Sequence, residues 1–257
     1  MKRASFSTAI CLLLLTAMIS CTSKPSSFTL TATINGLPEG TVVELMPGAT
    51  HQSERPIAES IVKDGSFTFK GTLKEPRLFE IVAINTEGSI KVLIEKGDVT
   101  VSGKATSTES EGKLSYQYDS IIVTGSDVHT LYKEKLAFLD SLNTLYDTFH
   151  ASNKEIMEAL KIAQEAHDDS LIRSLLQTEA FEKMQNDNKA IYDSVEVRIN
   201  KLITDNKKTW WAPFLMMDQM YMFDAQDKLL FVEFSGKAQN SYYGKLLKIQ
   251  LDAITEK

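Results

Sequence analysis

Glycine and proline are concentrated in the first half of the chain, and this asymmetry constrains the fold more than any other feature. Ten of the 12 glycines lie at or before Gly125, and none occurs between Ser126 and Ser235. Five of the 6 prolines lie at or before Pro76. Because glycine and proline mark turns, we expect short elements joined by turns in the first half and long uninterrupted elements in the second.

Alternating apolar and polar residues indicate strands in the first half. Over residues 28–34, apolar residues alternate with threonine, a period of two that places one face of a strand on a core. The Asp64-Gly65 pair between two apolar runs is typical of a hairpin turn. Further strands are expected at 42–46, 57–62, 66–71, 78–84, 89–95, 98–102 and 114–123, and a polar loop at 106–113. Such a series predicts an antiparallel β-sandwich or barrel over residues 28–125.

Apolar residues recur at helical spacing through the second half. A first helix is expected from an N-cap at Asp127 to Phe149, and a second begins near Asn153. Residues 167–170 are expected to separate it from a third, long helix. The third helix is expected at 171–202, and further helices at 210–223, 228–234 and 238–254. The chain is thus predicted to be of the α+β class with segregated strands and helices, in which an all-α region over 126–257 follows the sandwich.

The N-terminal residues have the pattern of a bacterial lipoprotein signal peptide. Lys2 and Arg3 precede an apolar run over 10–15 that is too short to cross a bilayer. Cys21 resembles the first mature residue of a lipobox, whose thiol is acylated before the signal peptide is cleaved. Met18 departs from the leucine that is usual at its position. We therefore expect lipidation of Cys21; an ordinary signal peptide cut elsewhere and a buried core helix are the alternatives.

A lipid on Cys21 would define where the protein resides. Several acyl chains on one residue hold a protein to a membrane firmly, whereas a single chain binds weakly. With residues 1–20 removed as the signal peptide, residues 21–27 contain too little apolar surface to fold and are expected to form a lipidated tether. No acidic run follows the cysteine. We therefore expect an envelope protein that is anchored to the outer membrane and faces the periplasm.

Cysteine use and net charge exclude several classes of protein. The chain has 2 cysteines, of which Cys11 would leave with the signal peptide and Cys21 would be blocked by lipid. The mature chain is then expected to have no disulfide, no thiol nucleophile and no thiolate metal site. The formal net charge of -6 argues against binding to nucleic acid, because that function requires a basic surface.

Five segments of the chain carry a resemblance to a known family. They are residues 28–40, 62–71, 93–98, 123–126 and 240–247. The first four are similar to the all-β domain of unknown function (DUF4369-like) that precedes the thioredoxin-like domain in Gram-negative envelope lipoproteins of the thiol–disulfide oxidoreductase (AhpC/TSA) type. The last is similar to the helix before that thioredoxin-like domain. The resemblance covers essentially the whole mature chain and implies an all-β domain followed by a helical region.

The redox motif of that family has no counterpart in this sequence. The family carries a Cys-x-x-Cys at the start of a helix in its thioredoxin-like domain. This sequence ends at Lys257, where that domain would be expected to begin. We therefore expect the thioredoxin-like domain to be absent and no residue to inherit its catalytic role.

The histidines form no recognisable metal or catalytic motif. His51, His129, His150 and His167 include no pair at the i, i+4 spacing of a helical metal site. Two aspartates follow His167, a pattern that favours capping residues at a helix break over a metal or acid–base cluster. Glycine-rich phosphate-binding loops are also lacking. We therefore expect no catalytic residue, no metal and no cofactor.

Residues 210–223 form an unusual segment that is rich in methionine and aromatic residues. Four of the 9 methionines lie within this segment. Such side chains adapt to irregular partner surfaces, but large exposed apolar patches are uncommon, so burial in a core is the favoured interpretation. The candidate partner-binding residues are Trp210, Trp211, Phe214, Met216, Met217, Met220 and Tyr221.

Together these features favour a non-enzymatic lipoprotein that binds a ligand or assembles with an envelope protein. The main alternative, which follows from the resemblance, is a stand-alone accessory part that works with a thioredoxin-like thiol–disulfide oxidoreductase encoded separately. A third hypothesis is a hydrolase that uses carboxylates on the sandwich, for which no pair can be singled out.

Overall fold

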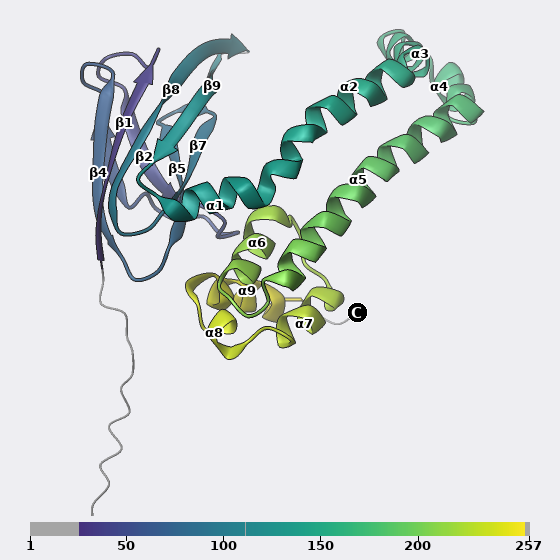
Figure 1. Cartoon of the computed structure of the whole chain (residues 1–257). Coiled ribbons are helices and arrows are strands. Elements are labelled where there is room, and N and C mark those ends of the chain that lie inside the picture. Colours follow the sequence, from purple (N-terminus) through teal and green to yellow (C-terminus); the bar gives the residue numbers. More distant parts are fainter. Residues whose placement is uncertain (1–25, 111, 255–257) are drawn as a thin grey trace, which may run out of the picture.

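The computed structural model describes residues 26–110 and 112–254, and within them strands precede helices (Figure 1). The predicted α+β class with segregated strands and helices is confirmed. The predicted signal peptide over residues 1–20, the lipidation site Cys21 and most of the predicted tether lie outside the described residues.

All strands come before the helices along the chain. The strands are β1 (Ser26–Asn35), β2 (Val42–Pro47), β3 (Ala58–Ile61), β4 (Ser66–Leu73), β5 (Arg77–Ala83), β6 (Thr86–Glu87), β7 (Ser89–Ile94), β8 (Gly97–Ser110) and β9 (Lys113–Thr124). The helices are α1 (Asp127–Leu136), α2 (Leu142–Ser152), α3 (Lys154–Glu165), α4 (Asp169–Leu175), α5 (Glu179–Asp205), α6 (Trp211–Gln219), α7 (Ala225–Val232), α8 (Gly236–Gln239) and α9 (Tyr242–Asp252). None of these helices is long and apolar enough to span a membrane.

Two sheets enclose the first core. One sheet has the strand order β4-β1-β8-β9-β6, and the other has the order β3-β2-β5-β7. In β1, every second residue from Phe28 to Ile34 is buried, while the threonines between them are not. Phe69 of β4 and Phe79 of β5 join this core from the two sheets. The period-two pattern of the sequence therefore predicts correctly which face of β1 is buried.

The strand pairing is not purely antiparallel. β1 pairs with β8 in parallel, with Phe28 opposite Gly97, and β6 pairs with β9 in parallel. Between β4 and β8, the chain forms β5 and β7 of the second sheet and the short β6 of the first sheet, and it then enters β8 in the same direction as β1. The prediction of an antiparallel sandwich or barrel is therefore wrong for these two pairs.

The polar stretch 106–113 forms a long hairpin and not the predicted loop. β8 continues to Ser110 and β9 begins at Lys113, and these two residues pair with each other. Thr106 pairs with Gln117 and Thr108 with Ser115 on the way to that turn. The residues of β8 from Thr106 onward are exposed, so backbone pairing alone holds them. Their polar composition gave no core-facing stripe, which is why the sequence pattern missed the strand.

The first helix begins one residue earlier than expected and ends sooner. Its N-cap is Ser126, whose side chain accepts a hydrogen bond from the backbone N–H of His129, and not Asp127. Gly125 forms the turn before it with a φ of 79°, and a Cβ there would lie 2.0 Å from the Asp98 carbonyl oxygen. A 3₁₀ segment over Ala137–Ser141 then separates α1 from α2, so the single predicted helix is two.

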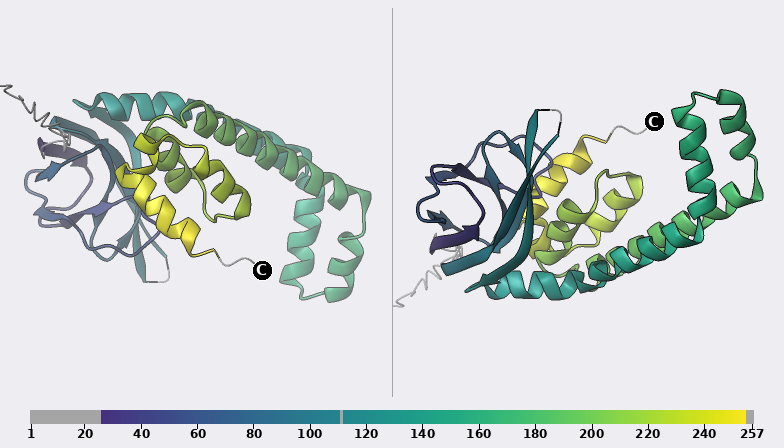
Figure 2. Two further views of the ribbon diagram at one scale, coloured as in Figure 1. Left: turned by 90° about the horizontal axis from the view of Figure 1, so that it is seen from below. Right: turned by 90° about the horizontal axis from the view of Figure 1, so that it is seen from above.

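The helices from α2 to α5 form an arm that projects from the body. α2 and α5 run side by side, with α3 and α4 at the far end (Figures 1 and 2). Asp168 caps α4, in agreement with the expected helix break. The predicted third helix is interrupted between α4 and α5, because the Thr178 side chain accepts a hydrogen bond from the Phe181 backbone N–H and starts a new helix.

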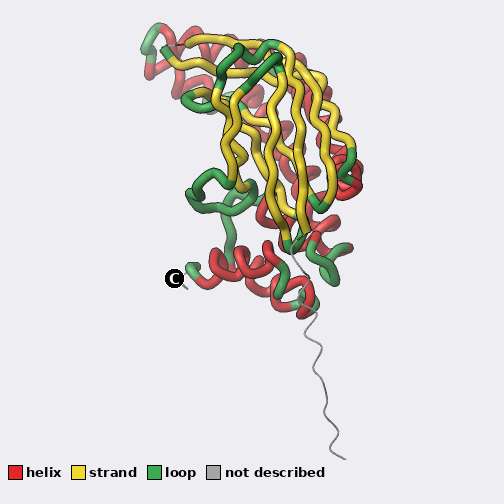
Figure 3. Tube along the Cα trace, turned by 90° about the vertical axis from the view of Figure 1, so that its left-hand side faces the viewer, coloured by secondary structure: helices red, strands yellow, loops and turns green. Residues whose placement is uncertain are grey.

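A second core joins the sandwich to the helices. Leu78 of β5 and Leu93 of β7 point away from the first core and pack against α1, α5 and the helices from α6 to α9. Seen from the strand side, some helices lie behind the sheets and others extend below them (Figure 3). β5 and β7 thus contribute to both cores, and the boundary between strands and helices is a packed interface.

Candidate functional site

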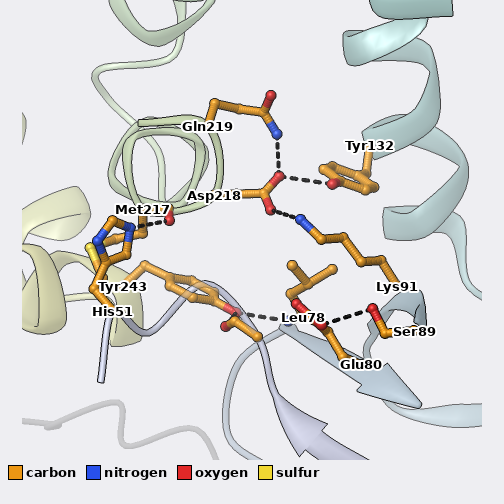
Figure 4. Close-up of polar contacts among 11 residues, drawn as sticks. His51, Leu78, Glu80, Ser89, Lys91, Tyr132, Met217, Asp218, Gln219 and Tyr243 are labelled. Atoms are coloured by element: carbon orange, nitrogen blue, oxygen red, sulfur yellow. Dashed lines mark hydrogen bonds and ion pairs between the residues drawn. The ribbon is translucent and has the colours of Figure 1, made fainter. Parts of the chain in front are cut away.

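A cavity of about 480 Å³ lies where the sandwich meets the end of α6. Its sandwich side is formed by residues 47–52 at and after the end of β2, by Glu80 of β5 and by Lys91 of β7. Its helical side is formed by residues 217–221, at the end of α6 and in the loop that follows. We call this the junction cavity (Figure 4). Its two sides come from segments that are far apart in the sequence.

Asp218 is the buried charge of the junction cavity. Its side chain is only 1% exposed. The carboxylate accepts hydrogen bonds from the Tyr132 hydroxyl at 2.8 Å, from the Lys91 ammonium at 3.0 Å and from the Gln219 amide (Figure 4). A buried carboxylate is costly unless it is paired and hydrogen-bonded. The donors from α1, β7 and α6 therefore converge on one point and hold these elements together.

The same contacts define the chemistry at the mouth of the cavity. Burial, reinforced by the nearby Asp218 carboxylate, raises the pKa of Tyr132 well above its usual value, so its hydroxyl stays protonated as a donor. The Lys91 side chain is 46% exposed, and Asp218 uses one of its three N–H groups. Glu80 lies opposite Lys91 in the β5–β7 pair and accepts a hydrogen bond from the Ser89 hydroxyl at 2.9 Å. The cavity thus presents an ammonium beside a carboxylate.

Two ring side chains hold the loop after β2 against the helices. The Nε2 atom of His51 donates to the Met217 carbonyl at 2.7 Å. The hydroxyl of the buried Tyr243 accepts from the Leu78 backbone N–H at 2.7 Å and donates to the Gly48 carbonyl at 3.4 Å (Figure 4). Burial raises the pKa of Tyr243 far above its usual value, so this hydroxyl also remains protonated. The cavity wall is therefore preformed.

The arrangement is suited to recognition through charge and ring contact. Tyr221 lines the cavity and is 97% exposed, so its ring adds a flat apolar surface that faces solvent. Within residues 26–110 and 112–254, no three histidine, cysteine, aspartate or glutamate side chains are placed to hold a metal ion.

The methionine- and aromatic-rich segment is buried along α6 and becomes exposed after the helix ends. Trp211, Phe214, Met216 and Met217 are buried in the second core, and Trp210 and Met220 are partly buried. The predicted helix over 210–223 ends early at Gln219, because Met220 is extended and Asp224 caps α7. Of the candidate partner-binding residues, Tyr221 is the one whose side chain is exposed at the junction cavity.

Sequence reasoning missed the charged residues of the site. The contacts of Asp218 reach Lys91 and Tyr132, which are 127 and 86 positions away, so no local motif connects them. One signal was present: Asp218 and Gln219 interrupt an apolar run. A polar pair at the end of a buried helix requires hydrogen-bond partners, and these partners define the cavity.

His129 is a structural histidine between β7 and α1. Its Nδ1 atom accepts a hydrogen bond from the Leu93 backbone N–H at 3.2 Å, and the Ser126 hydroxyl donates to the Leu93 carbonyl at 2.8 Å. The backbone N–H and the backbone carbonyl of Leu93 are thus both hydrogen-bonded to residues at the start of α1. Burial, with a smaller effect from the nearby Lys133 ammonium, lowers the pKa of His129 to about 4.

This pKa predicts that acid weakens the fold. Between pH 6.5 and about pH 4, the unfolded chain takes up a proton on His129 that the folded chain does not, so the free energy of unfolding is expected to fall over that range. In His129→Asn, the amide oxygen can replace Nδ1 as acceptor, and the decrease in the free energy of unfolding that His129 causes is expected to disappear. Urea unfolding at a series of pH values measures it. His167→Asn, at an exposed histidine, is the control, and equal pH profiles for wild type and His129→Asn would contradict the prediction.

Comparison with known proteins bears on the strand-rich half. No curated protein matches the chain. The thioredoxin-like link suggested by the resemblance receives no support from these comparisons. The family described as a domain of unknown function (DUF4369) matches residues 28–132, which span the sandwich and the start of α1 and include Lys91 and Tyr132 but not Asp218.

Proposed function

We propose that the protein is a non-enzymatic, membrane-anchored lipoprotein of the periplasmic face that acts as a binding or assembly module and takes up its ligand at the junction cavity. The observation that carries this proposal is the cavity itself. Its volume of about 480 Å³ is in the range of known ligand sites, which often lie where two structural units meet. The sequence pattern that ends at Cys21 supports the anchor.

The chemistry of the cavity indicates the kind of ligand. Lys91 offers an ammonium to an anionic group, and Glu80 offers carboxylate oxygens to a donor. Tyr221 offers an exposed ring face in the lining of the same cavity. A polar segment or small molecule that carries both charges and an apolar portion would satisfy all three, as an exposed peptide of an envelope protein does.

Tyr221 allows a direct test of the binding site. Tyr221→Ala is expected to weaken partner retention by at least about tenfold, because truncation of a tyrosine at an interface commonly costs about 2 kcal/mol. Met222→Ala is the matched control, since Met222 is the next residue, is 83% exposed and does not line the cavity. The measurement is recovery of bound envelope components by the tagged full chain from detergent-solubilised membranes. Equal recovery by both variants would place binding elsewhere.

A second candidate function is an accessory role beside a thioredoxin-like oxidoreductase encoded separately. The observation that favours it is the match of residues 28–132 to DUF4369, which is the domain type named in the resemblance. The test adds the purified chain to such an oxidoreductase from the same envelope and measures its disulfide reduction rate. A changed rate supports the accessory role, and an unchanged rate counts against it.

A further inference from the structure

A second, smaller cavity lies between the β4–β5 connection and the start of α9. Its volume is about 270 Å³, and it is lined by residues 72–75, Arg77, Tyr242 and Lys245. It shares no lining residue with the junction cavity. Three cationic side chains and one carboxylate line it, in a chain whose formal net charge is -6. The local excess of positive charge is thus opposite in sign to that of the whole protein.

Arg77 is held in this cavity by aromatic rings. Its guanidinium carbon lies 4.1 Å from the centre of the Tyr242 ring and 5.3 Å from that of Phe79. One guanidinium nitrogen donates to the Tyr242 hydroxyl, and Nε is buried without a hydrogen-bond partner among the described residues. No ion pair joins Arg77 to a carboxylate of the described chain. The rings orient the guanidinium but do not neutralise it.

Lys245 places a second cation beside the first. It is exposed on the first turn of α9, and among the described residues no ion pair includes it. The one carboxylate of the lining, Glu75, already accepts the Tyr242 backbone N–H at 2.7 Å. Arg77 and Lys245 are therefore two cationic groups in a cavity whose one lining carboxylate is already engaged.

We propose that this cavity is a binding site for a phosphate group. A guanidinium presents a planar fork of N–H donors that matches phosphate oxygens, and an ammonium adds a point charge on the same group. Arg77 and Lys245 supply these two donors from β5 and α9. The proposal rests on this pair and on the stacking that fixes the guanidinium, and it does not depend on the junction cavity.

The position of the cavity suggests where the phosphate comes from. Leu73, which lines it, is paired with Ser26 at the start of β1. Ser26 lies five positions after Cys21 in the sequence, a span of at most about 18 Å when fully extended. With a lipid on Cys21, phospholipid headgroups would lie within reach of Arg77 and Lys245. A free phosphate or phosphorylated small molecule is the other source of the same chemistry.

The first experiment measures binding of inorganic phosphate to the purified full chain by calorimetry at low ionic strength, because salt screens exposed charges. Lys245→Gln is expected to weaken the affinity by about tenfold, as for loss of one charge-assisted hydrogen bond. Lys248→Gln is the matched control: Lys248 lies on the same helix, is exposed, pairs with Asp252 and does not line the cavity. Its affinity is expected to equal that of wild type.

A second variant removes the planar set of N–H donors that the Arg77 guanidinium provides. Arg77→Lys keeps the charge but loses the planar donor geometry, and it is also expected to weaken phosphate binding about tenfold. If that variant fails to fold, Lys245→Gln still decides the question, because Lys245 is exposed. Absence of phosphate binding at millimolar concentration, or equal affinity in Lys245→Gln and Lys248→Gln, would overturn the proposal.

The last measurement separates the two sources of phosphate. The mature chain from residue 21 carrying Cys21→Ser, which has neither an acyl chain nor the apolar signal peptide to insert, is sedimented with phosphatidylcholine vesicles that contain or lack phosphatidylglycerol. Vesicle binding that Lys245→Gln abolishes supports a lipid headgroup as the ligand. Phosphate binding without vesicle binding supports a soluble phosphate compound. Both outcomes retain the site and differ only in what fills it.

Discussion

Replacing Phe214 by alanine is expected to lower the free energy of unfolding by about 3–5 kcal/mol, the usual cost of truncating a buried phenylalanine. Phe214 is fully buried in the second core. Its ring centre lies 4.9 Å from that of Tyr243, 5.6 Å from that of Tyr132 and 5.7 Å from that of Trp211. Alanine would leave a cavity among three rings that come from α1, α6 and α9. The lost packing therefore includes contacts of α1 and α6, the helices that carry Tyr132 and Asp218.

The measurement is urea unfolding followed by tryptophan fluorescence. The chain has 2 tryptophans, Trp210 and Trp211, and their stacked rings lie 4.4 Å apart beside Phe214. Fluorescence therefore reports on the second core specifically. Met222→Ala is the control and is expected to change the stability by less than about 0.5 kcal/mol, because its side chain is exposed. A loss below about 1 kcal/mol in Phe214→Ala would show that the segment is not core and would favour its alternative interpretation as a partner surface.

The strands of the first core were predictable because each one obeys a local rule. Burial in β1 follows its alternation of apolar residues with threonine. The Asp64-Gly65 turn was recognisable because both residues adopt positive φ, which this pair tolerates. In β5, the adjacent residues Leu78 and Phe79 are both apolar and are buried on opposite faces, although Glu80 then interrupts the apolar residues. That pattern contained the information that β5 is covered on both sides.

The positions where elements end were less predictable, because they depend on competition between neighbouring groups. Ser126 and Asp127 are both good N-caps, and the hydrogen bond of Ser126 to Leu93 on β7 selects the serine. Thr178 interrupts a run of apolar residues with helical spacing, and a single side-chain hydrogen bond decides that break. The parallel pairing of β1 with β8 depends on the whole path of the chain between them, which no window of sequence contains.

The candidate site could not be assembled from sequence, because its contacts join residues that are far apart in the chain. Lys91 and Asp218 have no shared motif, and Tyr243 meets Leu78 at a separation of 165 residues. Each of these residues has an ordinary local explanation, as a strand residue, a helix end or a core aromatic. Their combination follows from the packing of the helices against the outward face of β5 and β7, which is a consequence of the second core.

Replacing Cys21 by serine, in a precursor whose residues 1–20 are exchanged for a signal peptide that is cleaved without acylation, is expected to move the protein from the membrane fraction to the soluble fraction. Each buried CH₂ group of an acyl chain contributes about 0.8 kcal/mol to membrane binding, so several chains on one residue hold the protein almost irreversibly. A serine at this position lacks the thiol that carries the first chains. The loss of membrane association is therefore expected to be nearly complete.

Cys11→Ser is the matched control for this experiment. Both positions are cysteines near the N-terminus, but Cys11 lies within the predicted signal peptide and would be absent from the mature chain. Fractionation and intact mass are measured together. Wild type and Cys11→Ser are expected to give the same mass, that of a chain from Cys21 with its acyl groups, whereas Cys21→Ser is expected to lack them. If Cys21→Ser remained on the membrane with an otherwise unchanged mass, the anchor would lie elsewhere. The mature chain would then carry a free thiol, and redox chemistry would again have to be considered for it.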